Sequence, residues 1–400
     1  MKIIYPLLAI LLGLSCSETN TQNRNNNLNS KEYEKEYVNC IDSSNKNLRI
    51  LRLTGTSYEI GLQHGTLLKD EINESIENWK MQLKEQYEYY PEDFIKLILD
   101  STDYISAIKN STPGLLDELK GISDGSEIEL ETILVYNFID EIWTNFHLIN
   151  SVDHCTAIAV NNHEKSDNIV LLGANIDCPQ KDYYILDIQH NDFPRILTPT
   201  FPGYLGANGL NKEFGITVNS LWDLNGSFDG LPAVCVVRGA LMQPDFKSAT
   251  DFLKNIKHAS GLNYTLADNH QVLSIECSAN AKEIYWPNPE NRTYTYHTND
   301  PRVNKDFSDR YIQLVEGEMK KNISTWEFHC DRLQSLNERI TSNSNLQDIK
   351  DALSSKDYKV PICNEDTWIS TIVEFRKNET KLYISPGKPD STEYITIEIE

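Results

Sequence analysis

The chain has 400 residues, 40% of them hydrophobic, so it can bury a sizeable core in one large domain or two smaller ones. Its formal net charge of -22 at pH 7 argues against a nucleic-acid partner, because phosphate binding needs clustered Lys and Arg. An acidic surface of this kind is also what ordinary solubility produces, since like charges keep molecules apart.

The first residues have the pattern of an export signal. Lys2 precedes the apolar run IIYPLLAILLGL, which is too short for a comfortable membrane span. The run ends in LGLSC, which resembles the lipobox of bacterial lipoproteins, where the cysteine becomes acylated. We therefore expect a signal over residues 1–16, a lipid anchor on Cys16 and a protein exported to the cell envelope. Ordinary secretion after cleavage nearby is the alternative.

A polar segment separates this signal from the folded part of the chain. Residues 17–46 are rich in Asn and charged side chains and cannot bury a core, so they predict a flexible tether. We expect a single domain over residues 47–400.

The first part of that domain has mostly helical patterns. LRILRLTG alternates as a short strand does, and the run from TSYEIGLQHG to KMQLKEQY then carries apolar residues at helical spacing. Further helical patterns cover about 92–109, 114–122 and 128–147. The glycines at helical spacing in GLQHG predict close packing against another helix. Residues 47–154 are therefore expected to form a mostly helical segment.

At Cys155 the pattern changes from helix to strand. CTAIAVNN and NIVLLGANID are strand-like runs joined by the charged turn HEKSD, which predicts a β-hairpin. Strand patterns recur in GYLGANGLNKEFGITVNSL and in several later segments, with helices over GALMQPDFKSATDFLKNI and about 304–342. Helices followed by antiparallel strands, with helices returning between them, predict a layered α+β domain.

Cys155 by itself is compatible with a small buried core residue or with a nucleophile. In a papain-like arrangement, His297 would be its base and Asn299 would orient that histidine. CTAIAV looks like a strand, however, whereas a papain-like cysteine begins a helix. In a second arrangement the protein cleaves its own peptide bond between His154 and Cys155. The new α-amino group of Cys155 then serves as the base for its thiol.

Seven motifs in order carry a family resemblance. They are GTSYEIGLQHGTLLKDEI, CTAIAV, LLGANID, GYLGANGLNKEFGITVNSL, NYTLADNHQVLSIECS, YHTND and the terminal stretch from STIVEF to LYISPGKP. From about Leu51 to the C-terminus the chain resembles the acyl-coenzyme A:6-aminopenicillanic acid acyltransferase family, peptidase C45, of the N-terminal nucleophile hydrolases. The resemblance implies a four-layer αββα sandwich, self-cleavage before the cysteine, and a thioester acyl-enzyme.

The resemblance also implies site residues. Cys155 matches the nucleophile, Asp177 the acid that holds the α-amino group, with Asn175 beside it, and Asn299 an oxyanion donor. A carboxylate can orient an amine, and an amide NH₂ can donate to a developing oxyanion.

The remaining site predictions concern two arginines and the cysteines. Arg238 and Arg310 are candidates for binding a substrate carboxylate, or for pairing with buried acids. The eight cysteines are scattered without zinc spacing, so we expect no structural metal site.

The function implied is that of a self-processing amidohydrolase or acyltransferase. It would act on the C–N bond of a small acylated amine or amino acid and would need no cofactor. His154 stands where the family often has a small residue, and Ala157 replaces a hydroxyl residue of the penicillin-producing fungal enzymes, which argues against penicillin biosynthesis. The rival prediction is a non-catalytic surface lipoprotein that uses the same fold to bind a lipid or protein partner.

Overall fold

The computed structural model describes residues 40–41, 47–146, 155–162, 169–178, 182–320 and 330–399. The predicted export signal, Cys16, most of the predicted tether and His154 lie outside these ranges. Within them, no helix combines the length and the apolar character needed to cross a membrane.

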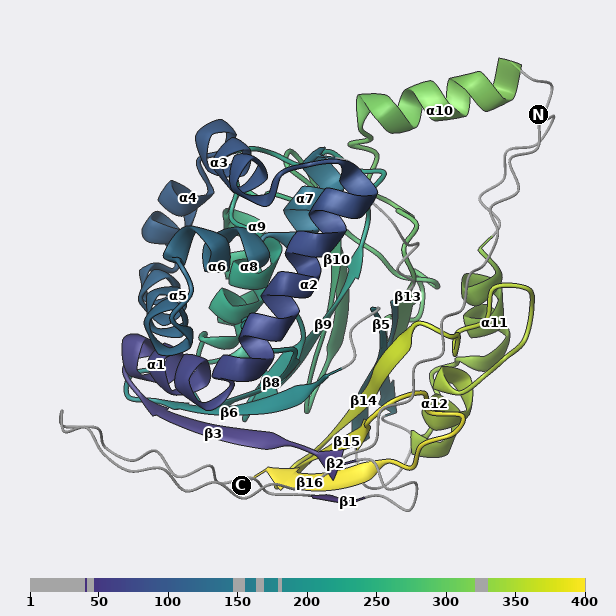
Figure 1. The fold of residues 1–400 in the computed structure, drawn as a ribbon. Coiled ribbons are helices and arrows are strands. Elements are labelled where there is room, and N and C mark those ends of the chain that lie inside the picture. The colour runs from purple at the N-terminus through teal and green to yellow at the C-terminus, as the bar shows by residue number, and fades with distance from the viewer. Residues whose placement is uncertain are drawn as a thin grey trace. The chain divides into compact units, whose positions relative to one another are not determined.

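Along the described chain, a run of helices up to residue 146 precedes most of the strands, and further helices lie between those strands (Figure 1). The helices are α1 (Ser57–Leu67), α2 (Lys69–Tyr87), α3 (Pro91–Ser101), α4 (Tyr104–Ser111), α5 (Pro113–Ser126), α6 (Leu130–Tyr136), α7 (Ile139–Phe146), α8 (Ala233–Leu241), α9 (Phe246–Asn255), α10 (Asp309–Lys320), α11 (Asp331–Arg339) and α12 (Leu346–Leu353). The strands are β1 (Cys40–Ile41), β2 (Asn47–Leu48), β3 (Ile50–Gly55), β4 (Thr156–Asn162), β5 (Ile169–Asp177), β6 (Tyr184–His190), β7 (Ile196–Thr200), β8 (Gly209–Asn211), β9 (Phe214–Ser220), β10 (Leu262–Asp268), β11 (Val272–Cys277), β12 (Lys282–Ile284), β13 (Tyr294–His297), β14 (Thr367–Arg376), β15 (Glu379–Ser385) and β16 (Ile395–Ile399).

Two large sheets face one another. One has eight strands in the order β12-β11-β10-β9-β8-β7-β6-β3, and the other has six in the order β13-β4-β5-β14-β15-β16. Apolar side chains from the inner faces of both sheets belong to one buried cluster, which the helices α1 to α9 extend. A second buried cluster lies between the six-stranded sheet and helices α11 and α12. Each sheet therefore has one face on the other sheet and one face on helices.

The layers are those of the predicted αββα sandwich. Helices α1, α8 and α9 contact strands of the eight-stranded sheet, and α11 and α12 contact strands of the six-stranded sheet. Figure 1 shows this succession of helices, sheet, sheet and helices. The predicted α+β class and its layering are confirmed.

The helical segment before the nucleophile forms for local reasons. Thr56 caps α1 in a capping box with Glu59, which satisfies two N–H groups at the helix start. The predicted close packing is confirmed, because a Cβ on Gly61 would lie 1.9 Å from the carbonyl oxygen of Glu118 on α5. One predicted helix is two: α1 and α2 meet at the fully buried Leu68, whose φ of -112° interrupts the helix.

Strand pairing brings distant parts of the chain beside Cys155. The predicted hairpin is confirmed as the antiparallel pair β4 and β5, with Thr156 opposite Asn175. On the other side of β4, His297 of β13 lies opposite Ala157. Asn299 follows β13 by two residues and Cys155 directly precedes β4, so both lie at the same end of this antiparallel pair.

The predicted helix over about 304–342 is wrong in its extent. Residues up to Ser308 form a loop, α10 begins at Asp309, and α11 is a separate helix. Helix α12 was not predicted, although Asn345 and Asp348 form the capping box that marks its start.

Candidate active site

Cys155 stands directly before β4 and is half-buried at the wall of a cavity. Two side chains donate hydrogen bonds to its carbonyl oxygen, Arg332 Nη1 at 2.8 Å and Asn219 Nδ2 at 2.9 Å. Asn219 comes from β9 of the opposite sheet and Arg332 from α11. The backbone at Cys155 is therefore held from two layers of the sandwich.

Arg332 links Cys155 to Asn299. The arginine is 3% exposed, and its Nη2 donates to Asn299 Oδ1 at 3.0 Å while Nη1 also lies 3.3 Å from Thr156 Oγ1. A planar guanidinium can hold several acceptors at once in a fixed geometry. Arg332 was not predicted, because a charged helical residue far from the nucleophile carries no local pattern. Asn219 stood in a quoted motif but received no role.

The side-chain amide of Asn299 is held at both its nitrogen and its oxygen. One hydrogen of its Nδ2 is used by the carbonyl oxygen of Ser220 at 3.0 Å, and Arg332 fixes its Oδ1. An amide NH₂ has two hydrogens, so one remains for an oxyanion. The amide group is thereby oriented before any substrate arrives.

The loop that carries Asn299 is tied to a buried carboxylate. Glu276 accepts hydrogen bonds from the main-chain N–H groups of Val303 and Asn304 at 3.0 and 2.7 Å, and it lies 2.8 Å from His297 Nε2. Burial raises the pKa of Glu276, but the hydrogen bond and charge of His297 and the main-chain donors outweigh it and lower the pKa overall.

His297 itself is fully buried and contacts the groups that hold this loop. Its Nε2 lies against Glu276 and its Nδ1 is 2.7 Å from the carbonyl oxygen of Thr298. Both ring nitrogens are thus engaged away from Cys155, which disfavours the papain-like arrangement.

Asp177 lines the same cavity as Cys155, at the end of β5. Asn364 Nδ2 donates to its Oδ2 at 2.7 Å. Burial raises the pKa of Asp177 to about 7, and the hydrogen bond of Thr367, the charge of Arg332 and the bond from Asn364 oppose that rise. A carboxyl group with this pKa can ionise near neutral pH when a cationic amine lies beside it.

The structure does not bring Asn175 to this cavity. The side chain is fully buried, and Nδ2 donates to the carbonyl oxygens of Leu353 at 2.8 Å and Ile362 at 3.2 Å. Asn175 therefore fastens the end of α12 and the loop after it to the six-stranded sheet.

The two candidate arginines also lie away from the cavity wall. Arg238 of α8 is 1% exposed and pairs through both terminal nitrogens with Glu118 of α5, at 3.0 and 2.8 Å. Arg238 therefore pairs with a buried acid, which is the second of the two roles considered for it. Arg310 is exposed at the start of α10.

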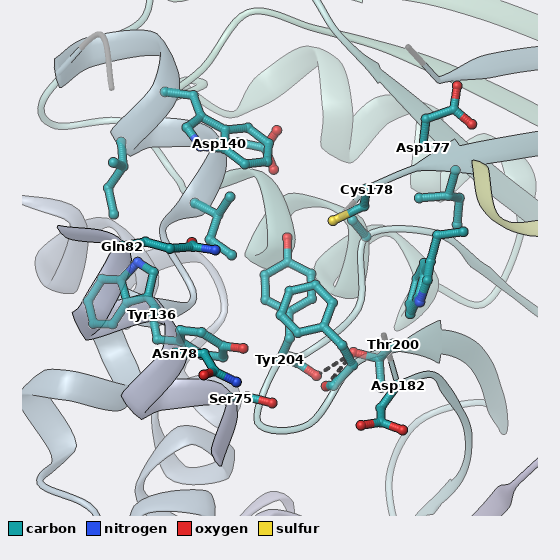
Figure 2. A pocket seen from close by; sticks show the side chains of 18 of the residues that line it. Ser75, Asn78, Gln82, Tyr136, Asp140, Asp177, Cys178, Asp182, Thr200 and Tyr204 are labelled. Carbon is teal, nitrogen blue, oxygen red and sulfur yellow. Dashed lines mark hydrogen bonds between the residues drawn. The ribbon is translucent and has the colours of Figure 1, made fainter. Parts of the chain in front are cut away.

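The cavity has a volume of about 480 Å³, and seven aromatic side chains contribute to its mixed polar and apolar wall (Figure 2). These are Trp79, Tyr87, Tyr136, Trp143, Phe201, Tyr204 and Trp368. Several pack ring against ring, including Phe201 and Tyr204, stacked with centroids 4.3 Å apart. The helical segment before Cys155 supplies one wall, and the strands and loops after it supply the other.

Together these features describe a site for acyl chemistry. A thiol and a carboxyl group line one cavity, and Arg332 links the Cys155 carbonyl group to the amide of Asn299. Such a group of residues can form a covalent acyl intermediate and stabilise the oxyanion that precedes it.

Two facing sheets between helical layers, with a cysteine at the start of an inner strand, have the architecture of the N-terminal nucleophile hydrolases. Residues 165–391, more than half of the chain, match the family model described as acyl-coenzyme A:6-aminopenicillanic acid acyl-transferase. The chain belongs to this family.

Three curated relatives have recognisable similarity. Protein dcd1B of Dictyostelium discoideum is 28% identical over 226 residues, covering 50% of this chain and 43% of that protein. The acyl-coenzyme A:6-aminopenicillanic-acid-acyltransferase 40 kDa form of Emericella nidulans is 28% identical over 230 residues, covering 56% and 62%. Bovine acid ceramidase is 23% identical over 338 residues, covering 73% and 77%. The matches to the first two span less than two thirds of those proteins.

Proposed function

We propose that the protein is a self-processing cysteine amidohydrolase or acyltransferase that acts on the C–N bond of acylated amines. The observation that carries the proposal is Cys155 at the start of β4, at the cavity wall, with its carbonyl group held by Arg332 and Asn219. The family match, whose description is that of an acyl-transferase, supports it. The rival prediction of a non-catalytic binding protein gains no support from the comparisons.

Self-processing would begin with attack of the Cys155 thiol on the carbonyl carbon of His154. The acyl group moves from the Cys155 nitrogen to its sulfur, and water then hydrolyses the thioester. The products are a carboxylate on His154 and a free α-amino group beside the thiol of Cys155. Asp177 is the acid proposed to hold that amino group.

Turnover would use the same thiol and the new amine. The α-amine takes the proton of the Cys155 thiol, and the thiolate attacks the acyl carbonyl of the substrate. The remaining N–H of Asn299 Nδ2 donates to the oxyanion. The C–N bond then breaks as the α-ammonium returns its proton to the departing amine. Water, or a second amine, finally attacks the thioester and releases the acyl group.

Intact-mass measurement of purified protein tests the proposal. Wild-type protein should consist of two fragments divided between His154 and Cys155, and Cys155→Ala should remain one chain without activity on acyl amides. Cys178→Ala is the matched control, because Cys178 is a second thiol lining the same cavity. An uncut wild-type chain, together with a Cys155→Ala variant of unchanged activity, would refute the proposal.

We also propose that the protein is exported and anchored to the cell envelope through a lipid on Cys16. The support is the signal-like run that ends in LGLSC. A Cys16→Ser variant should move from the membrane fraction to the soluble fraction. Retention of that variant in the membrane fraction would contradict the anchor.

A further inference from the structure

The charge of the cavity wall is one-sided. Five of the described lining residues carry carboxyl groups, and within the described ranges no Lys, Arg or His lines the cavity. The five are Glu74, Glu85, Asp140, Asp177 and Asp182. A wall of this charge attracts cations and repels a substrate that carries a carboxylate or phosphate. Asp177 has the role proposed above, and Asp182 pairs with Arg49, so the remaining three are available to a ligand.

Asp140 differs from the other two because it is buried. It lies on α7, is 8% exposed, and lines the cavity (Figure 2). Its Oδ1 accepts a hydrogen bond from Ser220 Oγ at 2.9 Å, and no described residue donates to its Oδ2. Burial raises the pKa of Asp140, because a charge is disfavoured away from water. A cationic partner in the cavity would restore its ionised form.

The neighbouring carboxyl group has a different environment. Glu141 accepts hydrogen bonds from the main-chain nitrogen of Ala233 at 2.9 Å and from the hydroxyl of Ser260. These contacts tie Glu141 to the start of α8 and to the segment before β10. Asp140 alone of this pair therefore belongs to the cavity wall.

Asp140 is also linked to the proposed oxyanion donor. Ser220 donates its hydroxyl to Asp140 and accepts from Asn299 Nδ2 through its carbonyl oxygen, at 2.9 and 3.0 Å. One residue thus connects the buried carboxyl group to the proposed oxyanion donor. A group bound by Asp140 would lie near the scissile amide rather than at a remote end of the substrate.

Aromatic rings accompany the carboxyl groups. Trp143 is three positions after Asp140 on α7, hence on the same side of the helix, and both line the cavity. Phe201 and Tyr204 contribute the stacked pair described above. Aromatic faces attract ammonium groups, most strongly where water is excluded. Carboxylate oxygens among aromatic rings are a combination suited to a cationic nitrogen.

We propose that the cavity takes acyl amides that carry an ammonium group near the scissile bond, and that Asp140 selects them. This inference rests on the proposed amidase or acyltransferase function. It names a substrate class that differs from amides of amino acids, whose carboxylate would meet the like charges of these side chains.

Three substrates with the same acyl chain test the selection. N-dodecanoyl-1,2-diaminoethane presents an ammonium group, N-dodecanoylethanolamine a hydroxyl in the same position, and N-dodecanoylglycine a carboxylate. Wild-type kcat/KM should be highest for the first and lowest for the third. Asp140→Asn should lower kcat/KM for the ammonium substrate roughly tenfold or more, the effect of one charged hydrogen bond, and change the ethanolamine substrate far less. Glu131→Gln, which removes an exposed carboxylate outside the cavity wall, should leave the ratio of the two unchanged.

A binding measurement separates this inference from the proposed function. Tryptophan fluorescence of the purified full-length protein is titrated with decylammonium, decanol and decanoate. Preferential binding of decylammonium that Asp140→Asn abolishes would support the inference even if no amide is hydrolysed, in which case the proposed function alone fails. Cys155-dependent hydrolysis with the same substrate preference in wild type and Asp140→Asn would overturn the inference and leave the function standing.

Discussion

Arg332→Lys is the substitution that most directly tests how the site is held. The guanidinium donates from two nitrogens, Nη1 to the carbonyl oxygen of Cys155 at 2.8 Å and Nη2 to Asn299 Oδ1 at 3.0 Å. A lysine keeps the positive charge, but its single nitrogen cannot reproduce a fork that spans two acceptors. The variant should therefore lose the orientation of either Cys155 or Asn299.

The size of the loss follows from one missing charged hydrogen bond. Such a bond contributes about 1.5–3 kcal/mol, and Asn219 still supports the Cys155 carbonyl at 2.9 Å. If the lost bond is the one that orients the Asn299 amide, the transition state is destabilised by that amount, because Asn299 is proposed to donate to the oxyanion. Since about 1.4 kcal/mol corresponds to a tenfold change in rate, kcat/KM should fall roughly ten- to a hundredfold.

The assay is kcat/KM for an acyl-amide substrate, with thermal unfolding measured in parallel. Arg339→Lys is the matched control, because Arg339 lies on the same helix and makes an exposed pair with Asp357. Arg332→Met adds a second readout. The positive charge of Arg332 lowers the pKa of Asp177, so its removal should raise that pKa further above about 7 and shift the pH profile of activity. Wild-type kcat/KM in Arg332→Lys would refute the reasoning.

Two further predictions concern buried charges. The first is made in the uncut Cys155→Ala background. There the pKa of Asp177 is about 7 in the folded chain and 3.8 in the unfolded chain, so between these pH values only the folded chain keeps the proton. Asp177 therefore destabilises the fold increasingly as pH rises toward about 7. Adding Asp177→Asn should therefore raise the free energy of urea unfolding more at about pH 8 than at about pH 4. Arg238→Met should destabilise by about 3–5 kcal/mol in the same assay, because Glu118 stays buried without its partner, and adding Glu118→Leu should recover much of that loss.

The sequence predicted the fold where each element carries its own pattern. Alternation of apolar residues marks the β4 and β5 hairpin, and apolar residues at helical spacing mark α1. Boundaries that depend on tertiary contacts were missed, such as the break at Leu68, whose side chain is buried in the core. In the later helical region, α12 had a recognisable start in Asn345 and Asp348, so that omission was avoidable.

The candidate site could be predicted only in part, for a physical reason. Cys155 stands where the helical pattern changes to a strand pattern, so a local pattern indicates it, whereas Asp177 followed from the family resemblance. Arg332 lies 177 positions from the carbonyl it binds, and Asn219 lies 64 positions away. The pattern of residues in a short stretch of sequence does not indicate contacts between residues so far apart. A binding role for Asp140 was likewise not predictable from the sequence, because that role depends on which cavity α7 faces.

The position of the proposed cut separates Asp140 from the residues that position the thiol. Cys155, Asn219, Asn299 and Arg332 all follow it, whereas the aromatic wall from α2 and α7, together with Asp140, precedes it. The helices before the cut share one buried apolar cluster with the sheets after it. Cleavage would therefore remove one peptide bond and leave most of the burial that holds the segments together. Substrate selection could then change through the helical segment without disturbing the residues that position the thiol.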